Sequence, residues 1–281
     1  MVEIKLKANA KINLFLDILN KRKDGYHNIR TIFQEISLTD EIYVREIKNG
    51  IKIFCAHPKV PTNKTNLVYK AADLLKKHSG IKKGILIKIK KNIPVGGGLG
   101  GGSSDAAAVL KGLNKLWNLK LTKNQLAGIG KKIGADVPFF IYGGRCLGEG
   151  IGAQLTPLKI RKTEWYVLVK PPFEISTKNA YAYLRLTKTR KTDKIKKCVN
   201  RLEDVVIPLY PEIKKIKDLL TESGAEFSLM SGSGSCVFGF VKNKIAGIRI
   251  KNRLQKAGYV VWLVHSVEAI KNSKLKMKSY G

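Results

Sequence analysis

A run of small residues, Asn92 to Leu110, carries the clearest chemistry in the chain. It reads NIPVGGGLGGGSSDAAAVL, with six glycines around Leu99, two serines and then a segment with helical spacing. The alternating stretch GILIKIKK precedes it and predicts a strand. Glycines let backbone N–H groups turn inward without a Cβ in the way, and the first turn of a helix has unpaired N–H donors. This order predicts an anion site in which Ser103 and Ser104 either cap the helix or offer hydroxyls to phosphate or Mg²⁺.

The familiar nucleotide-binding loops fit this run poorly. A Walker A loop requires G-x-x-x-x-G-K-S/T, and no lysine follows these glycines. A dinucleotide fingerprint is met trivially by so many glycines, and the acidic ribose contact expected about 20 residues further on is missing. The H-R-D and D-F-G signatures of protein kinases are also absent. The run therefore predicts a phosphate site of another kind.

The elements that must position this loop are mixed strands and helices. Strands are expected from residue 2 through KINLFLDIL, as two strands in GYHNIRTIFQEISLTDEIYV, and in WYVLVKP, EFSLMSG, SCVFGFV and YVVWLVHS. Helices are expected over 66–77 with Asn66 as N-cap, in SDAAAVLKGLNKLW, over 123–133, and from Thr177, Pro211 and Ile245. Without the regular alternation of a doubly wound sheet, this order favours an α+β fold in two lobes. A boundary near 155–164 predicts an N-terminal domain of residues 1–157 and a C-terminal domain of residues 158–281.

Composition and length narrow the class of protein. The chain has 281 residues, of which 44% are hydrophobic and 8% aromatic, as in globular proteins rather than disordered ones. No apolar run approaches the ~18 residues that span a bilayer, and the N-terminus alternates charge and hydrophobe too early for a signal peptide. We expect a cytoplasmic protein with no membrane partner. Four scattered cysteines and four histidines form no zinc-binding spacing, so reduced thiols are expected.

The charge balance is strongly basic. Lysine and arginine number 53 against 21 acidic residues, a formal net charge of +32. Such a field attracts anions, nucleic acid among them. The lysines are spread along the whole chain, however, and no zinc finger, aromatic RNA-binding pattern or GXXG clamp accompanies them. The sequence favours a diffuse basic surface that attracts small phosphorylated molecules, and nucleic acid is not the expected partner.

Several motifs together resemble the GHMP small-molecule kinases. PVGGGLGGGSSDAA resembles their second motif, AKINLFL near the N-terminus resembles the first, and SGSGSCVFGF, residues 231–240, resembles the third. DGYHNIRTIFQEI, GADVPFF and the triple-glycine form of the loop are most similar to members that act on 4-diphosphocytidyl-2-C-methyl-D-erythritol. The resemblance covers almost the whole chain. It implies a two-lobed GHMP fold with an N-terminal ATP-binding lobe, a C-terminal α/β lobe and the active site in the cleft between them.

The resemblance also implies an activity and its catalytic residues. It implies transfer of the γ-phosphoryl of ATP to the 2-hydroxyl of 4-diphosphocytidyl-2-C-methyl-D-erythritol, in the non-mevalonate route to isoprenoid precursors. Asp136 in GADVPFF matches the catalytic aspartate that would orient and deprotonate the acceptor hydroxyl. Lys11 in AKIN matches its partner lysine, which would keep that carboxylate ionised and stabilise charge on the transferred group. The residues alone leave Asp136 open to being a helix cap before Pro138 and Lys11 to being one more surface lysine.

Binding residues follow from the same resemblance. ATP would contact the glycine loop, the start of the following helix and two flanking positions: Pro94, Val95, Gly96, Gly97, Gly98, Leu99, Gly100, Gly101, Gly102, Ser103, Ser104, Asn66 and Lys91. The acceptor would contact Asn13, Tyr26, His27, Thr177 and Tyr181, with the two tyrosines stacking on the cytosine ring and His27 reading its edge. Mg²⁺ is expected with ATP, but its ligands cannot be identified from the sequence.

Two positions depart from the family pattern. Asn9 stands where the first motif usually has proline, which leaves the local geometry open. Asp105 stands where a neutral asparagine is common, and a carboxylate there would repel phosphate unless it points away or helps to hold Mg²⁺. The alternatives to the main interpretation are another GHMP kinase, acting on mevalonate, homoserine or a sugar, a basic nucleic-acid-binding protein, and a degenerate kinase fold kept as a binding module. The sequence does not indicate whether the protein is a monomer or a weak dimer.

Overall fold

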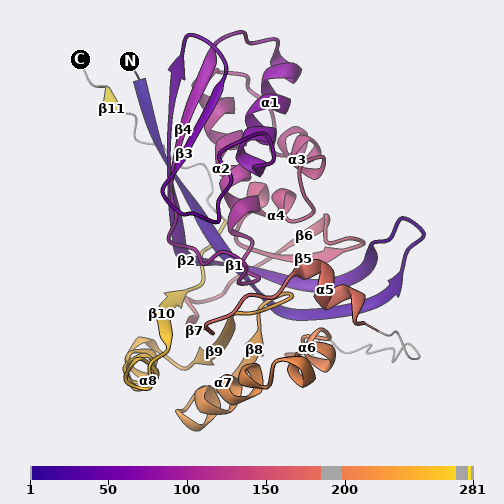
Figure 1. Ribbon diagram of the computed structural model, residues 1–281, viewed down its shortest axis with the longest axis vertical. Helices are drawn as coiled ribbons and strands as arrows, with labels where there is room; N and C mark the ends of the chain where they lie inside the picture. Colours follow the sequence, from indigo (N-terminus) through magenta and orange to yellow (C-terminus); the bar gives the residue numbers. More distant parts are fainter. Residues whose placement is uncertain (1, 185–197, 270–277, 280–281) are drawn as a thin grey trace.

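A computed structural model describes residues 2–184, 198–269 and 278–279, which form two sheets flanked by helices (Figure 1). The larger sheet has seven strands, with the order β11-β1-β2-β4-β3 and with β5 and β6 attached beside β2. Its strands are β1 (Val2–Lys21), β2 (His27–Ile47), β3 (Ile51–Cys55), β4 (Gly84–Lys90), β5 (Arg145–Glu149), β6 (Gln154–Leu158) and β11 (Lys278–Ser279). All of its pairings are antiparallel except β3 with β4.

The smaller sheet is antiparallel and has the order β10-β7-β9-β8. Its strands are β7 (Trp165–Lys170), β8 (Phe227–Met230), β9 (Val237–Val241) and β10 (Val260–His265). The larger sheet carries α1 (Leu67–Ser79), α2 (Gly101–Leu116), α3 (Lys123–Lys131) and α4 (Val137–Tyr142), and the remaining helices are α5 (Thr177–Ala182), α6 (Glu203–Leu209), α7 (Pro211–Glu222) and α8 (Lys244–Lys256). This mixed, two-lobed architecture confirms the predicted fold class. In the part of the chain that the structure describes, no helix is long and apolar enough to cross a membrane.

The first two strands are unusually long and serve both lobes. Near its start, β1 buries Ile4 and Leu6 in the core beneath α1 and α2, whereas farther along it buries Leu16 and Ile18 in the core of the second lobe. The hairpin between β1 and β2 extends toward α5 and α6 (Figure 1). One pair of strands therefore forms the floor between the lobes, and residues on it face both.

The prediction of two strands in the segment 25–44 is wrong, because β2 runs without interruption from His27 to Ile47. Its alternation of buried and half-buried residues continues through the segment where the break was expected. The pairing with β1 instead shifts register there: Asn9 faces Thr39, but Ala10 faces Ile36. A β-bulge absorbs the extra residues and bends the strand, so the chain changes direction without leaving the sheet.

The helix after the glycine run begins earlier than its sequence suggests. α2 starts at Gly101, and its N-cap is Gly100, with φ 69° in the left-handed region and no side-chain cap. The prediction that Ser103 or Ser104 caps this helix is therefore wrong, because both lie inside its first turn. Glycine adopts this conformation without a Cβ penalty, and the backbone N–H groups of the first turn stay open toward the loop.

Candidate active site

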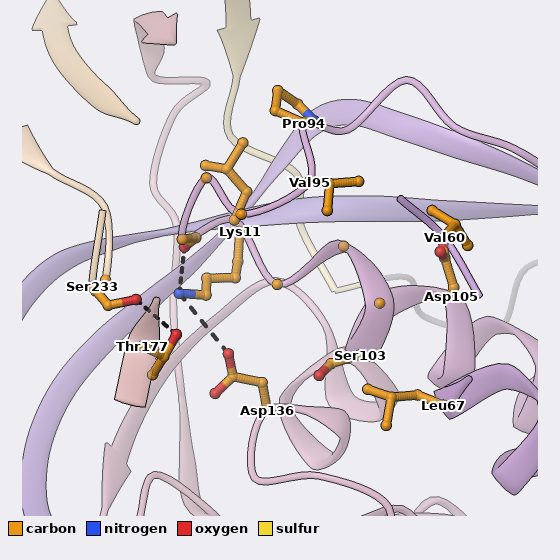
Figure 2. Close-up of a pocket in the computed structure, with 18 of the residues that line it drawn as sticks. Lys11, Val60, Leu67, Pro94, Val95, Ser103, Asp105, Asp136, Thr177 and Ser233 are labelled. Carbon is orange, nitrogen blue, oxygen red and sulfur yellow. Dashed lines mark hydrogen bonds and ion pairs between the residues drawn. The ribbon is translucent and has the colours of Figure 1, made fainter. Parts of the chain in front are cut away.

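A cavity of about 480 Å³ opens between the lobes and brings together most of the predicted residues (Figure 2). It is lined by the glycine loop and by side chains from both lobes. The predicted residues that line it are Lys11, Asn13, Asn66, Lys91, Pro94 to Ser103, Asp136, Thr177 and Tyr181. Segments separated by more than 100 residues thus share one hollow, as the resemblance implied.

Lys11 is held at the centre of this cavity and is not a surface lysine. Its side chain is 5% exposed, and its Nζ donates to Asn13 Oδ1 at 2.6 Å and to the carbonyl of Gly98 at 2.8 Å. Burial lowers the pKa of Lys11 from its ordinary value, while the nearby Asp136 raises it in part. β1 therefore aims a buried cation at the point where the glycine loop turns.

Asp136 lies across from this cation, with its Oδ2 3.9 Å from Lys11 Nζ (Figure 2). It is the N-cap residue of α4, and Pro138 in the first turn helps to start that helix. Its side chain makes no capping hydrogen bond and is 33% exposed. The carboxylate is thus not committed to the helix and faces the cavity, where it can accept a proton.

The glycine loop is held in place by the second glycine loop, residues 231–236. Ser231 Oγ donates to the carbonyl of Gly98 at 3.1 Å, and the backbone N–H of Cys236 donates to Gly97 at 3.2 Å. A Cβ on Gly98 would lie 2.1 Å from the carbonyl oxygen of Ser231, and its φ of 71° is left-handed. Only glycine fits here, so the second glycine loop, which belongs to the third motif, fixes the conformation of the first glycine loop.

The two serines at the start of α2 have different environments. Ser103 lines the cavity, between Asp136 and Leu67 (Figure 2). Ser104 is 2% exposed, and its Oγ donates to the carbonyl of Asn9 at 2.6 Å. Ser104 therefore anchors the helix to β1, and Ser103 is the serine that a phosphate could reach. Asn9 itself donates to Glu35 Oε1 at 2.9 Å, a tertiary contact at the position where the family motif has proline.

Lys91, predicted to touch adenosine, lines the cavity but binds two buried carboxylates. Its Nζ donates to Asp105 Oδ2 at 2.9 Å and also to Asp40 Oδ2. Asp40 accepts in turn from the backbone N–H groups of Asn92 and Ile93, at 2.6 and 2.8 Å. This cluster, Asp40, Lys91 and Asp105, ties the residues before the glycine loop to the helix after it.

Asp105 is the member of this cluster with the fewest hydrogen bonds. Its Oδ1 is buried and has no hydrogen-bond partner. Burial raises the pKa of Asp105 to about 7, Lys91 opposes this shift, and the neighbouring Asp40 adds to it. Figure 2 shows Asp105 directed toward Val60, on the side of α2 away from Asp136. The carboxylate of Asp105, which differs from the family pattern, thus points away from the reacting centre.

Of the predicted acceptor residues, Thr177 and Tyr181 line the cavity from α5. Thr177, the first residue of α5, shares a hydrogen bond of 2.9 Å with Ser233 Oγ (Figure 2). Tyr181, on the same helix, has its ring centroid 5.2 Å from that of His27. Tyr26 is 59% exposed. Neither Tyr26 nor His27 lines the cavity directly, and His27 reaches it through its contact with Tyr181.

Two predicted binding asparagines are already occupied by protein groups. Asn13 is 2% exposed and donates to Thr31 Oγ1 at 2.8 Å while accepting from Lys11. Asn66 caps α1, as predicted, by accepting from the backbone N–H of Val68 at 2.8 Å, and it donates to the carbonyl of Pro61. Both amides therefore hold neighbouring protein groups in place in the cavity wall.

Sequence reasoning missed four residues that contribute to the site. Gly232 and Ser233 line the cavity, although only the motif that contains them was singled out. Asn200 is 2% exposed, and its amide donates to the carbonyl of Gly232 at 2.7 Å, holding the second glycine loop. Asp40 stands in an ordinary strand pattern, and nothing in the sequence marks it as the anchor of the glycine loop.

Comparisons with known proteins show the family to which the chain belongs. Family models described as GHMP kinases N terminal domain and GHMP kinases C terminal match residues 66–144 and 184–260. The 4-diphosphocytidyl-2-C-methyl-D-erythritol kinase of Clostridium botulinum (strain Alaska E43 / Type E3) is 43% identical over 278 residues, covering 93% of this chain and 99% of the relative. The enzyme of the same description from Caldicellulosiruptor bescii is 43% identical, covering 90% of this chain and 94% of the relative.

Solved structures extend the likeness to three dimensions. A crystal structure of 4-(cytidine 5'-diphospho)-2C-methyl-D-erythritol kinase is 32% identical, with a TM-score of 0.81 over 94% of this chain and 99% of that one. A homoserine kinase from Cytophaga hutchinsonii is 18% identical, with a TM-score of 0.76 over 95% of both chains. At that identity the likeness shows a shared fold only.

Proposed function

The chain belongs to the 4-diphosphocytidyl-2-C-methyl-D-erythritol kinase family of GHMP kinases, and on that premise we propose that it phosphorylates the 2-hydroxyl of this acceptor with ATP. The products are ADP and the 2-phosphate, in the non-mevalonate route to isoprenoid precursors. The observation that carries the proposal is the position of Lys11, whose Nζ lies within reach of both the glycine loop at Gly98 and the Asp136 carboxylate.

Asp136 is the proton acceptor in this proposal. Its carboxylate faces the cavity without a capping bond, and the acceptor hydroxyl must lose its proton as it attacks the γ-phosphorus. Lys11, 3.9 Å away, stabilises negative charge on the transferred group. A lysine so buried loses little mobility on reaction, because Asn13 and Gly98 already hold it in place.

The phosphates of ATP occupy the concave side of the glycine loop. Residues 96–100 line the cavity, and the N-terminal turn of α2 adds unpaired backbone donors and the positive end of its dipole. Ser103 Oγ is the side-chain donor nearest to this turn that lines the cavity. Asn66 and Lys91 also line the cavity, and the adenosine would lie against these groups, which protein contacts already hold in place.

Mg²⁺ is expected to enter with the triphosphate. In the described residues no group of three or more His, Cys, Asp or Glu side chains could hold a metal ion. Among the oxygen groups that line the cavity, Ser103 Oγ and the Asp136 carboxylate would be the protein ligands of such an ion, which suits a cation that keeps phosphate and water ligands. When bound, Mg²⁺ neutralises charge on the β- and γ-phosphates.

The acceptor binds at the α5 end of the cavity in this proposal. Tyr181 and His27 form a tilted ring pair, and the exposed ring of Tyr26 lies on the adjoining loop. A cytosine can stack on such rings, while Thr177 and Ser233 offer hydroxyls to the diphosphate. A cytoplasmic location remains a prediction, as does the division into two domains, residues 1–157 and 158–281.

The test is ADP release in a coupled assay with purified protein, ATP and Mg²⁺. We expect turnover with 4-diphosphocytidyl-2-C-methyl-D-erythritol and none above background with mevalonate or homoserine. Asp136→Asn is the matched control, since it keeps the side-chain shape and removes the proton acceptor. Turnover on another acceptor would retain the ATP site and overturn the assignment of Tyr26, His27 and Tyr181.

A further inference from the structure

The larger sheet has one face against its helices and one face that collects basic and aromatic side chains. Helices α1 to α4 lie on one side of it (Figure 1), where residues such as Ile42, Val44 and Ile87 are fully buried. The opposite face carries the intervening residues of β1, β2, β4 and β3. We call it the open face, and its members used below are Lys5, Tyr43, Arg45, Lys52, Phe54 and Lys88.

Strand register places four of these residues in one row. Lys5 faces Tyr43, Tyr43 faces Lys88, and Lys88 faces Phe54. The row alternates cation and ring across four strands and is about 14 Å long at the usual strand spacing. Phe54 is 56% exposed, which is unusual for a large apolar ring and leaves one side of it free to stack.

A second row lies beside the first and carries two cations and one carboxylate, because Glu3 faces Arg45. Arg45 faces Leu86, which faces Lys52, and these residues border a hollow of about 640 Å³ together with Lys48, Phe54 and Lys88. The acidic residues on this face are Glu3 and Glu41. Glu41 is bound by Lys5 at 2.7 Å and by Lys90 at 3.6 Å, so its charge is already matched.

We propose that the open face binds a single-stranded nucleic acid. Lysine and arginine heads attract the phosphates, and an exposed aromatic ring between them gives a base a surface on which to stack. A duplex hides the faces of its bases, so it would use the charges but not Phe54. This site is separate from the kinase cavity, which Phe54 does not line, and it gives part of the +32 net charge a specific use.

The experiment is fluorescence anisotropy with a labelled twelve-residue oligouridylate, between 50 and 200 mM salt. Phe54→Leu removes the ring and keeps an apolar side chain, and Lys52→Ala with Lys88→Ala removes two cations. Lys214→Ala with Lys215→Ala is the matched control, because both side chains are about equally exposed on α7 of the other lobe. Kinase turnover and thermal unfolding of every variant are measured alongside, and we expect both to be unchanged.

We expect Phe54→Leu to weaken binding about tenfold, in the range found for loss of one stacked base. The open-face lysine pair should reduce the slope of log affinity against log salt by about 1.4, since a single strand contributes about 0.7 for each phosphate neutralised. The α7 pair should change neither quantity appreciably. Equal binding by Phe54→Leu, equal affinity for a duplex of the same length, or equal losses from both lysine pairs would overturn the proposal. Tighter, Phe54-dependent binding to vesicles of anionic lipid would overturn it in favour of a membrane surface.

Discussion

Replacing Asp105 by asparagine should stabilise the protein at alkaline pH and not at acidic pH. The carboxylate is 2% exposed, its Oδ1 has no partner, and Lys91 is shared with the better-connected Asp40. The fold holds the pKa of Asp105 at about 7, against 3.8 for an unperturbed aspartate. A buried carboxylate with a raised pKa opposes folding once it is ionised.

The sign and size of the effect follow from this shift. Below the unfolded pKa both states hold the proton, so Asp105 has no effect on the unfolding free energy there. Stability is lost as the pH rises from about 4 to 7 and the loss is complete above that, amounting to about 4 kcal/mol at ~1.4 kcal/mol per pKa unit. Asparagine is neutral throughout and still offers Lys91 an acceptor. The pKa of about 7 already includes the favourable contact with Lys91, so nothing is subtracted for it, and we expect a gain of about 4 kcal/mol at pH 8, or about 10 °C in Tm.

The assay is thermal unfolding followed by circular dichroism at pH 4 and pH 8, for wild type and Asp105→Asn. We expect the variant to gain stability at pH 8 and to lie within about 1 kcal/mol of wild type at pH 4. Asp40→Asn is the control with the opposite expectation, because Asp40 accepts two backbone N–H groups as well as Lys91. It should lose about 3 kcal/mol or more at both pH values, as when one partner of a buried ion pair is removed. A lower Tm for Asp105→Asn at pH 8, or an equal gain at both pH values, would refute the reasoning.

Three further substitutions test the site. Lys11→Met should reduce kcat by about 10²- to 10³-fold, which is the usual loss when a transition-state cation or donor is removed. Its Tm should change by only a few degrees. Turnover within tenfold of wild type would count against the catalytic role of Lys11. Gly98→Ala should raise the KM for ATP more than tenfold or prevent folding, since its Cβ would lie 2.1 Å from backbone of the second glycine loop. Gly102→Ala is its control, with a nearest neighbour at an ordinary 3.7 Å, and the idea fails if the two behave alike. Tyr181→Leu should raise the KM for the cytidine acceptor about tenfold, the loss of one stacked ring, and leave the KM for ATP unchanged; equal rises in both would instead indicate a distorted cleft.

Local sequence patterns determined the anion site, one helix cap and the strands of the second sheet. Six glycines between an alternating strand and an alanine-rich helix allow little besides a backbone anion site, because glycine and a helix N-terminus supply that chemistry by themselves. The cap at Asn66 could likewise be predicted, since an N-cap depends on a side chain two residues from its partner. The strands of the second sheet were also visible, because each is a short apolar run bounded by turn residues.

Contacts between distant segments were decided only by the tertiary structure. Nothing near Asp40 in sequence shows that it anchors Lys91 and the start of the glycine loop, 51 to 53 residues away. The sequence could not show that the Asp136 carboxylate makes no capping bond and instead pairs with a cation, because that cation lies 125 residues away. Ser104 turned out to be an anchor to β1 because helix phase in α2 depends on where Gly100 begins it.

The basic rows of the open face show the same limit. Lysines at positions 5, 52 and 88 look scattered along the chain, and they become neighbours only through the pairing of β1, β2, β4 and β3. A sequence specifies which residues each strand presents outward, through its period of two. Which outward residues meet depends on strand order and register, and the crossing of β4 between β2 and β3 has no local signal.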